Sequence, residues 1–197
     1  MDFVFANEGV GLRKKNRWQD LVQIKRCEIS NDKLNELLKE VWQWAEREKP
    51  EPFDVVKQIG TFKYAVIRAS EREQSSSVSF IINADSPRIP EAIALIEKFA
   101  AETRAENVVI GFVPAKTDMS IASQVIVKKG SAFLTETIAG TRLRFSSQAF
   151  FQNNTVMAEQ MVIYARKLLS DGGDLLVDLY GGAGTFGVSL AKLFKRM

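Results

Sequence analysis

A glycine-rich segment near residue 180 constrains the fold more than any other feature of this sequence. The apolar run Leu175-Leu176-Val177 leads into Asp178-Leu179-Tyr180-Gly181-Gly182-Ala183-Gly184, and a helical pattern follows over residues 185–195. A short continuous apolar run is typical of a strand buried on both faces, as in a parallel sheet. We therefore predict a buried strand, a glycine turn and a helix in this order.

Such a turn can hold a ligand, because it directs backbone N–H groups and a helix N-terminus toward it. Gly182 and Gly184 leave room where a Cβ would keep the backbone from closing on an adenosine or a carboxylate group. Tyr180 stands where the first glycine of a G-x-G-x-x-G motif is expected. A bare G-x-G is at least as often a plain strand-to-helix connection, and the turn alone does not separate a methyltransferase from a dinucleotide enzyme.

The first 147 residues have a different texture, with short strands around two helices. Apolar residues recur at helical spacing from Leu34 to Ala45, after the capping residues 30–32 and before Lys49-Pro50. A second helix begins near Pro90. The remaining segments predict short strands bounded by turns, including a hairpin whose polar loop covers residues 71–77: 2–24, 62–69, 78–82, 108–113, 124–128, 132–138 and 142–145.

This order predicts two domains. Residues 1–147 form an α+β domain with a mostly antiparallel sheet. Residues 148–197 begin with a long helix that places Ala158, Met161, Val162, Ala165 and Leu169 on one face and ends at Ser170–Gly173. This helix precedes the strand and glycine turn of the second domain.

Composition excludes several classes of protein. The chain contains no histidine, which removes imidazole-based triads and most zinc sites, and a single cysteine, Cys27, which cannot form an internal disulfide. No apolar run is long enough to cross a membrane, and no signal-peptide pattern begins the chain, so we expect a cytoplasmic protein without membrane partners. The net charge of +3 and pI near 9.0 are too mild to identify nucleic acid as a partner.

Two motifs in order carry a family resemblance. Phe150-Phe151-Gln152-Asn153-Asn154, a helix, and then Asp178–Phe186 resemble the signature of the S-adenosylmethionine-dependent RNA (uracil-5-)-methyltransferases. The resemblance is strong from about residue 124 and looser upstream, where Gly11–Lys15 and Cys27 are similar to the family's central domain. It implies that residues 148–197 are the first part of a Rossmann-like methyltransferase domain.

The resemblance also implies site residues. Gln152 should contact S-adenosylmethionine, and Asp178, Tyr180, Gly182 and Gly184 should line the same ligand, with Phe150 near the target base. From the residues alone, a capping amide is the preferred interpretation of Gln152, and Phe150 or Phe151 is a hydrophobic staple at a helix start.

The reaction of this family needs a cysteine thiolate that adds to carbon 6 of uracil and a carboxylate base that removes the carbon-5 proton. In the family both lie downstream of the glycine turn, so the chain is expected to be truncated before them, to contain no catalytic residue and to be inactive alone. Cys27 matches an iron–sulfur ligand of many members but lacks its three partners, so no cluster is expected.

The resemblance implies RNA as the partner, either rRNA or tRNA, and basic residues are available to contact it. Arg13, Lys14 and Lys15, with Arg17 and Trp18, and Arg142 and Arg144, with Lys128 and Lys129, are candidates for phosphate contacts, although such charges are often simply solvated. Two alternatives remain: a non-enzymatic RNA-binding module and a fragment of a nucleotide-binding oxidoreductase. An incomplete C-terminal domain with uncovered apolar faces also predicts self-association.

Overall fold

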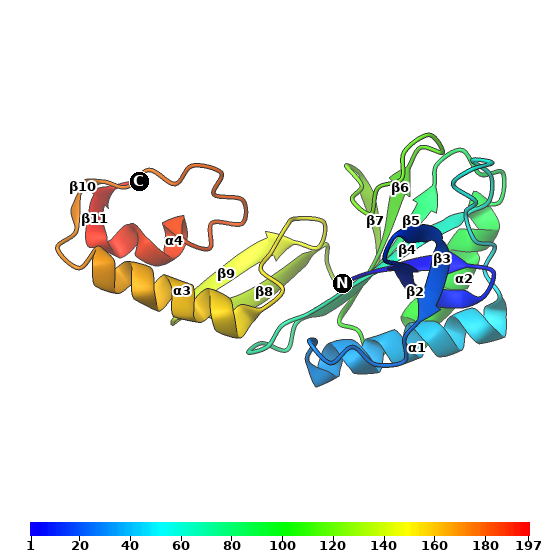
Figure 1. Cartoon of the computed structure of the whole chain (residues 1–197), viewed down its shortest axis with the longest axis horizontal. Coiled ribbons are helices and arrows are strands. Elements are labelled where there is room, and N and C mark those ends of the chain that lie inside the picture. Colours follow the sequence, from blue (N-terminus) through cyan, green and yellow to red (C-terminus); the bar gives the residue numbers. More distant parts are fainter. The chain divides into compact units, whose positions relative to one another are not determined.

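The computed structural model describes residues 1–197, and they form two compact units. Unit 1 comprises Met1–Ala69 and Ser75–Ala132, and unit 2 comprises Ser70–Gln74 and Phe133–Met197 (Figure 1). The division therefore falls before residue 133, earlier than the boundary near residue 147 predicted from the sequence. The difference arises because the hairpin over residues 133–146 packs with the C-terminal helix and not with the large sheet.

Unit 1 is built on a seven-stranded sheet with the order β3-β2-β1-β4-β5-β6-β7. All neighbouring strands are antiparallel except β5 and β6, which are parallel because a helix connects them. The α+β class and the mostly antiparallel sheet are thus confirmed. The strands are β1 (Asp2–Ala6), β2 (Gly9–Lys14), β3 (Arg17–Gln23), β4 (Phe62–Ala69), β5 (Ser76–Asn83), β6 (Asn107–Val113) and β7 (Val125–Lys129).

Two helices supply the apolar core on one face of this sheet, α1 (Asp32–Glu48) and α2 (Ile89–Glu102). The Asn31 side chain caps α1 by accepting a hydrogen bond from the Leu34 N–H at 2.8 Å, and α1 ends at Lys49 in a left-handed conformation. Both helices were predicted. Aromatic rings fill the space between helices and sheet, with Trp44 at 5.0 Å from Phe80 and 5.7 Å from Phe99 between ring centroids.

The opposite face of the sheet carries a smaller cluster and a buried cation. Tyr64 and Val66 of β4 alternate with Ala65 and Ile67, so they pack on the other side, with Ile81, Val113 and Ala122. The Lys63 ammonium donates to the backbone oxygens of Pro114 at 2.7 Å and Thr117 at 2.6 Å, and it lies 4.0 Å from the centroid of the Phe53 ring. Burial lowers the pKa of Lys63.

Strand β5 begins earlier than the sequence indicated. Ser76 and Ser77 belong to the strand and are buried, whereas the pattern placed them in a loop. The Ser76 hydroxyl donates to the Glu106 carboxylate, and the Asn107 side chain donates to the Ser76 carbonyl oxygen at 2.8 Å. These partners satisfy polar groups that would otherwise oppose burial.

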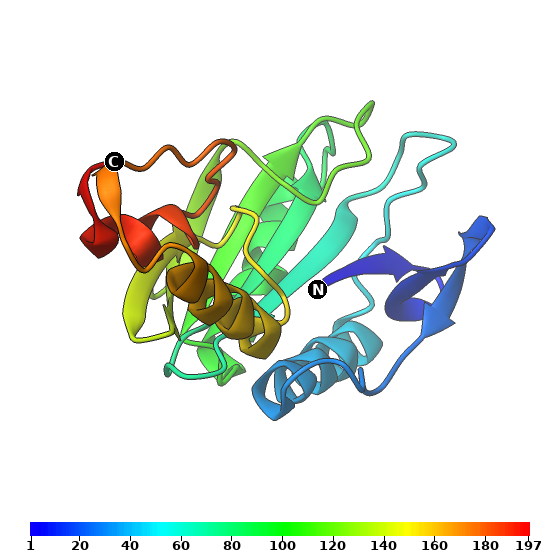
Figure 2. The same ribbon diagram turned by 60° about the vertical axis from the view of Figure 1, so that its left-hand side comes forward.

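Unit 2 is organised around the hairpin of β8 (Phe133–Ile138) and β9 (Thr141–Ser146) and the helix α3 (Thr155–Leu168) (Figures 1 and 2). Their inward side chains form a second core: Leu134, Ile138, Leu143, Phe145, Phe151, Ala158 and Val162. Of the predicted helix face, Ala158 and Val162 are buried, but Met161 and Leu169 are exposed. That part of the prediction was wrong.

Glu136 is the buried carboxylate of this unit. Its side chain accepts hydrogen bonds from the N–H groups of Glu71 at 2.7 Å, Arg72 at 3.3 Å and Thr137 at 2.9 Å, and from the Thr155 hydroxyl at 3.2 Å. It therefore joins the segment 70–74, the hairpin and the start of α3.

The C-terminal elements differ most from the predictions. A short strand β10 (Gly173–Leu175) pairs in parallel with β11 (Phe194–Arg196), and between them lie α4 (Gly187–Leu190) and the 3-10 turn η1 (Ala191–Leu193). The predicted helix over 185–195 was therefore too long. The predicted buried strand at 175–177 was also wrong, because Leu175 is 54% and Val177 64% exposed, with β11 as the only strand beside β10. No helix in either unit has both the length and the apolar character required to cross a bilayer.

Candidate cofactor and RNA sites

Asp178 closes the glycine turn onto the start of α4. Its Oδ2 accepts a hydrogen bond from the Gly187 N–H at 2.9 Å. A Cβ on Gly187 would lie 2.6 Å from the same oxygen, so only glycine permits this approach. The Gly184 N–H donates to the Gly181 carbonyl oxygen at 2.8 Å and completes the turn. Gly187 was not predicted as a site residue, although its position three residues after Gly184 is typical of close helix packing.

The turn contains three residues in the left-handed region: Tyr180 with φ 59°, Gly182 with φ 55° and Gly184 with φ 76°. Such a conformation is uncommon for tyrosine, and non-glycine residues of this kind cluster at ligand sites. Tyr180 is fully exposed. A Cβ on Gly182 would approach only the Tyr180 oxygen, at 3.8 Å, whereas one on Gly184 would lie 2.8 Å from Val188. Open space thus adjoins Gly182, and Gly184 lies close to Val188 of α4.

The Phe-Gln-Asn segment and the glycine turn adjoin the same apolar core. Phe151 stacks on Phe145, with 3.9 Å between ring centroids and 2° between planes, and Ala183 and Phe186 pack against the cluster that contains both rings. Phe150, in contrast, is 69% exposed. Phe151 is therefore the phenylalanine that anchors the segment, and Phe150 is accessible.

Gln152 is not the cap of the following helix. The Asn154 side chain has that role, since it accepts a hydrogen bond from the Met157 N–H at 2.9 Å. Gln152 is only partly exposed and lies next to the anchored Phe151. Its amide thus remains available at the edge of the core that the glycine turn also contacts.

Arg166 of α3 is a second residue that the sequence did not reveal. Its guanidinium donates to the Ala139 carbonyl oxygen at 2.6 Å, the Thr141 hydroxyl at 3.1 Å and the Ser189 carbonyl oxygen at 3.0 Å. These bonds connect α3 to the β8–β9 turn and to α4. The helical pattern gave no reason to single out this arginine among the exposed charges.

The basic residues of the β2–β3 hairpin divide into two kinds. Arg13 is held within the chain, because it donates to Asp118 at 2.9 Å, to the Trp18 carbonyl oxygen at 3.0 Å and to the Tyr64 hydroxyl at 3.4 Å. Burial, together with the hydrogen bond from the Tyr64 hydroxyl to Asp118, raises the pKa of Tyr64. Lys14 and Lys15 are exposed.

The other predicted cations lie on β7 and β9. Arg142 and Arg144 are exposed and alternate with the buried Leu143 and Phe145, so both point to one side of β9, as predicted. The Arg144 guanidinium lies 4.0 Å from the Phe133 ring centroid, and Arg142 is 3.7 Å from Glu73. The remaining two cations are engaged within unit 1, Lys128 with Glu97 at 2.8 Å and Lys129 with the Thr103 carbonyl oxygen at 2.7 Å.

Cys27 is a free, half-buried cysteine whose backbone is tied to α1. Its N–H donates to the Asn35 side chain at 2.7 Å, and the Asn35 amide donates back to its carbonyl oxygen at 3.1 Å. No three histidine, cysteine or carboxylate side chains come together in a group that could hold a metal ion.

Known proteins resemble the chain throughout its length. An uncharacterized RNA methyltransferase from Nanoarchaeum equitans is 27% identical over 198 aligned residues, covering 100% of this chain and 43% of that protein. The tRNA (uracil(54)-C(5))-methyltransferase of Pyrococcus furiosus is 24% identical and covers 98% and 44%. The chain thus spans less than half the length of these relatives.

A solved structure has the same fold. The tRNA (uracil-54, C5)-methyltransferase of Pyrococcus abyssi, in complex with S-adenosyl-L-homocysteine, matches with a TM-score of 0.77 at 23% identity. The match covers 98% of this chain and 45% of that one. The family model described as tRNA (Uracil-5-)-methyltransferase matches residues 97–197, which include the Phe-Gln-Asn segment and the glycine turn. Because this match covers half of the sequence, the chain belongs to the tRNA (uracil-5-)-methyltransferase family.

Proposed function

We propose that this chain is the part of an RNA (uracil-5-)-methyltransferase that faces RNA and begins the S-adenosylmethionine site. In this proposal a methyl group passes from S-adenosylmethionine to carbon 5 of a uridine. One observation supports it most strongly. The two motifs within the segment that the family model matches, residues 150–154 and 178–186, adjoin a single apolar core. The names of the Pyrococcus relatives favour tRNA over rRNA as the substrate.

The residues of the glycine turn fit such a cofactor. Gly182 has a positive φ and open space beside it, and the exposed Tyr180 precedes it in the same conformation. We assign cofactor contacts to Gln152, Tyr180, Gly182 and Gly184, with Asp178 fixing the turn through Gly187. The cofactor supplies an electrophilic methyl group on a sulfonium. We also propose that residues 173–197 begin a Rossmann-like fold. The parallel pairing of β10 with β11, which are connected through α4, supports this.

We assign no catalytic residue within these 197 residues. Cys27 is the only cysteine, and it lies in unit 1 in a loop bonded to α1, where its proposed role is structural. Methyl transfer by the chain alone is predicted to be absent. Phe150, exposed beside the anchored Phe151, remains the candidate for contact with the target base.

A matched pair of glycine variants tests the cofactor site. Gly182 and Gly140 both have positive φ and free space around the position of a Cβ, and both belong to unit 2. Gly182→Ala and Gly140→Ala therefore carry similar backbone strain. S-adenosylhomocysteine is titrated into each labelled variant while amide NMR shifts are recorded.

The expected result is a weak, saturable shift of the Gln152 side-chain amide and the Gly182 and Gly184 signals in the unmodified chain. Gly140→Ala should preserve these shifts and Gly182→Ala should abolish them, because a methyl group occupies the ligand's space. Equal loss in both variants, or equal shifts with NAD, would refute the assignment and favour the oxidoreductase alternative.

Self-association is a second proposal, supported by an apolar surface on unit 2. Large side chains of α3 and of the segment after it are between 47% and 77% exposed: Val156, Met157, Met161, Ile163, Tyr164, Leu168, Leu175, Val177 and Leu179. So many exposed large apolar side chains on one small unit favour a partner surface. We propose that the isolated chain pairs with a second copy here, which light scattering tests by molecular mass. A cytoplasmic location remains a prediction.

A further inference from the structure

A cleft of about 530 Å³ lies in unit 1 between the β2–β3 hairpin and the loop 51–60. Trp18 and Leu21 of β3 line it together with Phe53, Val56 and Ile59 of the loop. Val56 is 74% and Ile59 60% exposed, so the loop presents apolar side chains to solvent. The volume of the cleft is in the range of sites that bind small organic molecules.

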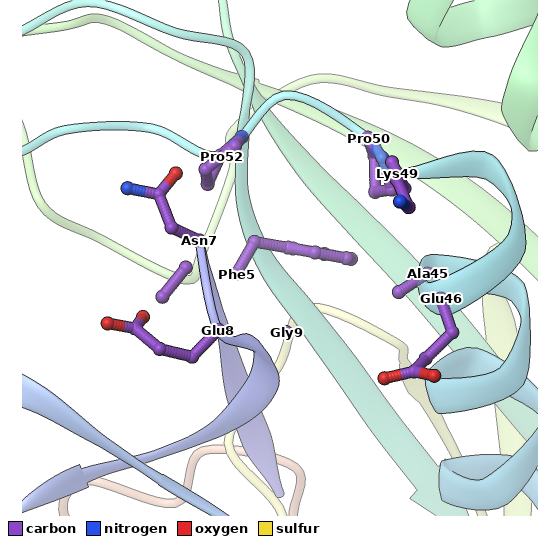
Figure 3. A pocket seen from close by; sticks show the side chains of 10 residues that line it. Phe5, Asn7, Glu8, Gly9, Ala45, Glu46, Lys49, Pro50 and Pro52 are labelled. Carbon is purple, nitrogen blue, oxygen red and sulfur yellow. The ribbon is translucent and has the colours of Figure 1, made fainter.

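A neighbouring hollow of about 460 Å³ has Phe5–Glu8 and Pro52 in common with this cleft. It extends toward α1, where Ala45 and Glu46 line it. Figure 3 shows this hollow, with Asn7 and Glu8 of the β1–β2 turn on one side and Glu46 of α1 and its C-cap Lys49 on the other. Glu8 lines both spaces.

Trp18 is held in place by Arg13. The Arg13 guanidinium lies 5.5 Å from the Trp18 ring centroid and donates to the Trp18 carbonyl oxygen. It also donates to Asp118, which in turn accepts a hydrogen bond from the Tyr64 hydroxyl of β4. The indole is nevertheless 46% exposed. A large aromatic ring that is both exposed and positioned can stack on a planar ligand without a large loss of side-chain entropy.

Two unpaired cations belong to the same hairpin as Trp18, and the charged residues of the cleft are mostly paired. Lys14 and Lys15 lie at the exposed hairpin tip and form no ion pair within the chain. Carboxylates line the cleft itself and are mostly paired: Asp20 with Arg17 at 3.1 Å, Asp54 with Lys57 at 3.5 Å and Glu51 with Arg88 at 3.6 Å. A phosphate is therefore favoured at the unpaired Lys14 and Lys15 over the carboxylates of the cleft, and a neutral base is favoured in the cleft beside Trp18.

We propose that this cleft binds an unstacked base of single-stranded RNA on Trp18, with the flanking phosphates at Lys14 and Lys15. Arg13 is then a positioning residue for Trp18 and not a phosphate contact. The proposal rests on the proposed function, because it names a surface through which an RNA methyltransferase of this kind holds its substrate. It adds a nucleotide site outside the unit that contains the glycine turn.

The test compares short fluorescein-labelled RNA heptamers with the same heptamers lacking their central bases. Binding to the full chain is measured by anisotropy at low salt, with tryptophan fluorescence as a second readout. Trp18→Ala should weaken binding of the base-containing RNA by about 5- to 150-fold, the range for loss of one stacked base, and leave the abasic RNA unaffected. Trp18→Phe should retain most of the affinity.

Val22→Ala on the same strand and Trp42→Phe on α1 serve as controls, since neither residue lines the cleft. Both should preserve affinity, and only Trp18 variants should lose RNA-induced quenching. Equal weakening of base-containing and abasic RNA by Trp18→Ala, or quenching by a lysine-rich peptide but not by RNA, would overturn the proposal while the cofactor test at Gly182 still stands. Absence of any RNA binding would overturn this proposal and the RNA part of the proposed function together.

Discussion

Glu136→Gln is the substitution whose effect follows most directly from the structure of unit 2. The carboxylate is 1% exposed, and its two oxygens accept four hydrogen bonds. Glutamine has the same shape but only one oxygen. The amide NH₂ would best replace Oε2, because the Thr155 hydroxyl can rotate to accept from it, and the Glu71 N–H then loses its acceptor.

The magnitude follows from these partners. One bond to a charged acceptor is lost, at roughly 1.5–3 kcal/mol, and the remaining bonds weaken because their acceptor is neutral. We expect unit 2 to be destabilised by about 3 kcal/mol. Local opening should become roughly a hundredfold more frequent.

Hydrogen exchange measured by mass spectrometry is the appropriate assay, because it reports each unit separately. All three tryptophans, Trp18, Trp42 and Trp44, belong to unit 1, so fluorescence-monitored unfolding should change little. Exchange should accelerate in the segment 70–74 and in the hairpin 133–146. Asp171→Asn, an exposed carboxylate-to-amide change in the same unit, is the matched control. Less than a threefold change in Glu136→Gln relative to this control would refute the role assigned to the carboxylate.

Two further predictions concern charge and association. Burial acts to raise the pKa of Glu40, but hydrogen bonds from Thr103 and Arg104 outweigh it and leave the pKa below its ordinary value of 4.5. The stabilisation by this carboxylate is therefore complete above that value and is lost as the pH falls through the folded-state pKa. Urea midpoints of Glu40→Gln should therefore depend less on pH between about 5 and 3 than those of the unmodified chain. An equal pH dependence of the two midpoints would contradict this. Leu168→Glu, on the exposed side of α3, should reduce the light-scattering mass toward the 22.1 kDa of one chain, whereas Val22→Glu on β3 should leave it unchanged; a monomer before substitution would contradict the proposed pairing.

Elements with local signals were predictable from the sequence. Helix α1 was predicted correctly because its cap, Asn31, and its apolar residues lie within one segment. The hairpin of β4 and β5 was also predicted from local apolar runs, although the start of β5 at Ser76 was not. Burial of Ser76 depends on Glu106 and Asn107, thirty residues away, which no local pattern reveals.

The structure of the glycine segment differs from the one predicted. The apolar run at 175–177 predicts a covered strand, yet coverage depends on neighbours that the sequence pattern cannot supply. Asp178 was predicted as a ligand-lining residue, whereas its visible partner is Gly187. The interaction of Arg13 with Asp118 spans 105 positions, so no local pattern indicates that this arginine is already paired within the chain.

The tip of the β4–β5 hairpin has an unusual place in the chain, since its strands belong to unit 1 and residues 70–74 to unit 2. The polypeptide thus passes between the units at residues 69–70, 74–75 and 132–133. A piece expressed from residue 133 onward would lack the strip that Glu136 holds, and a single proteolytic cut could not release either unit intact. During synthesis the tip must remain without its partner until the hairpin of β8 and β9 has been made, so the two units are interdependent products of one chain and not exchangeable modules.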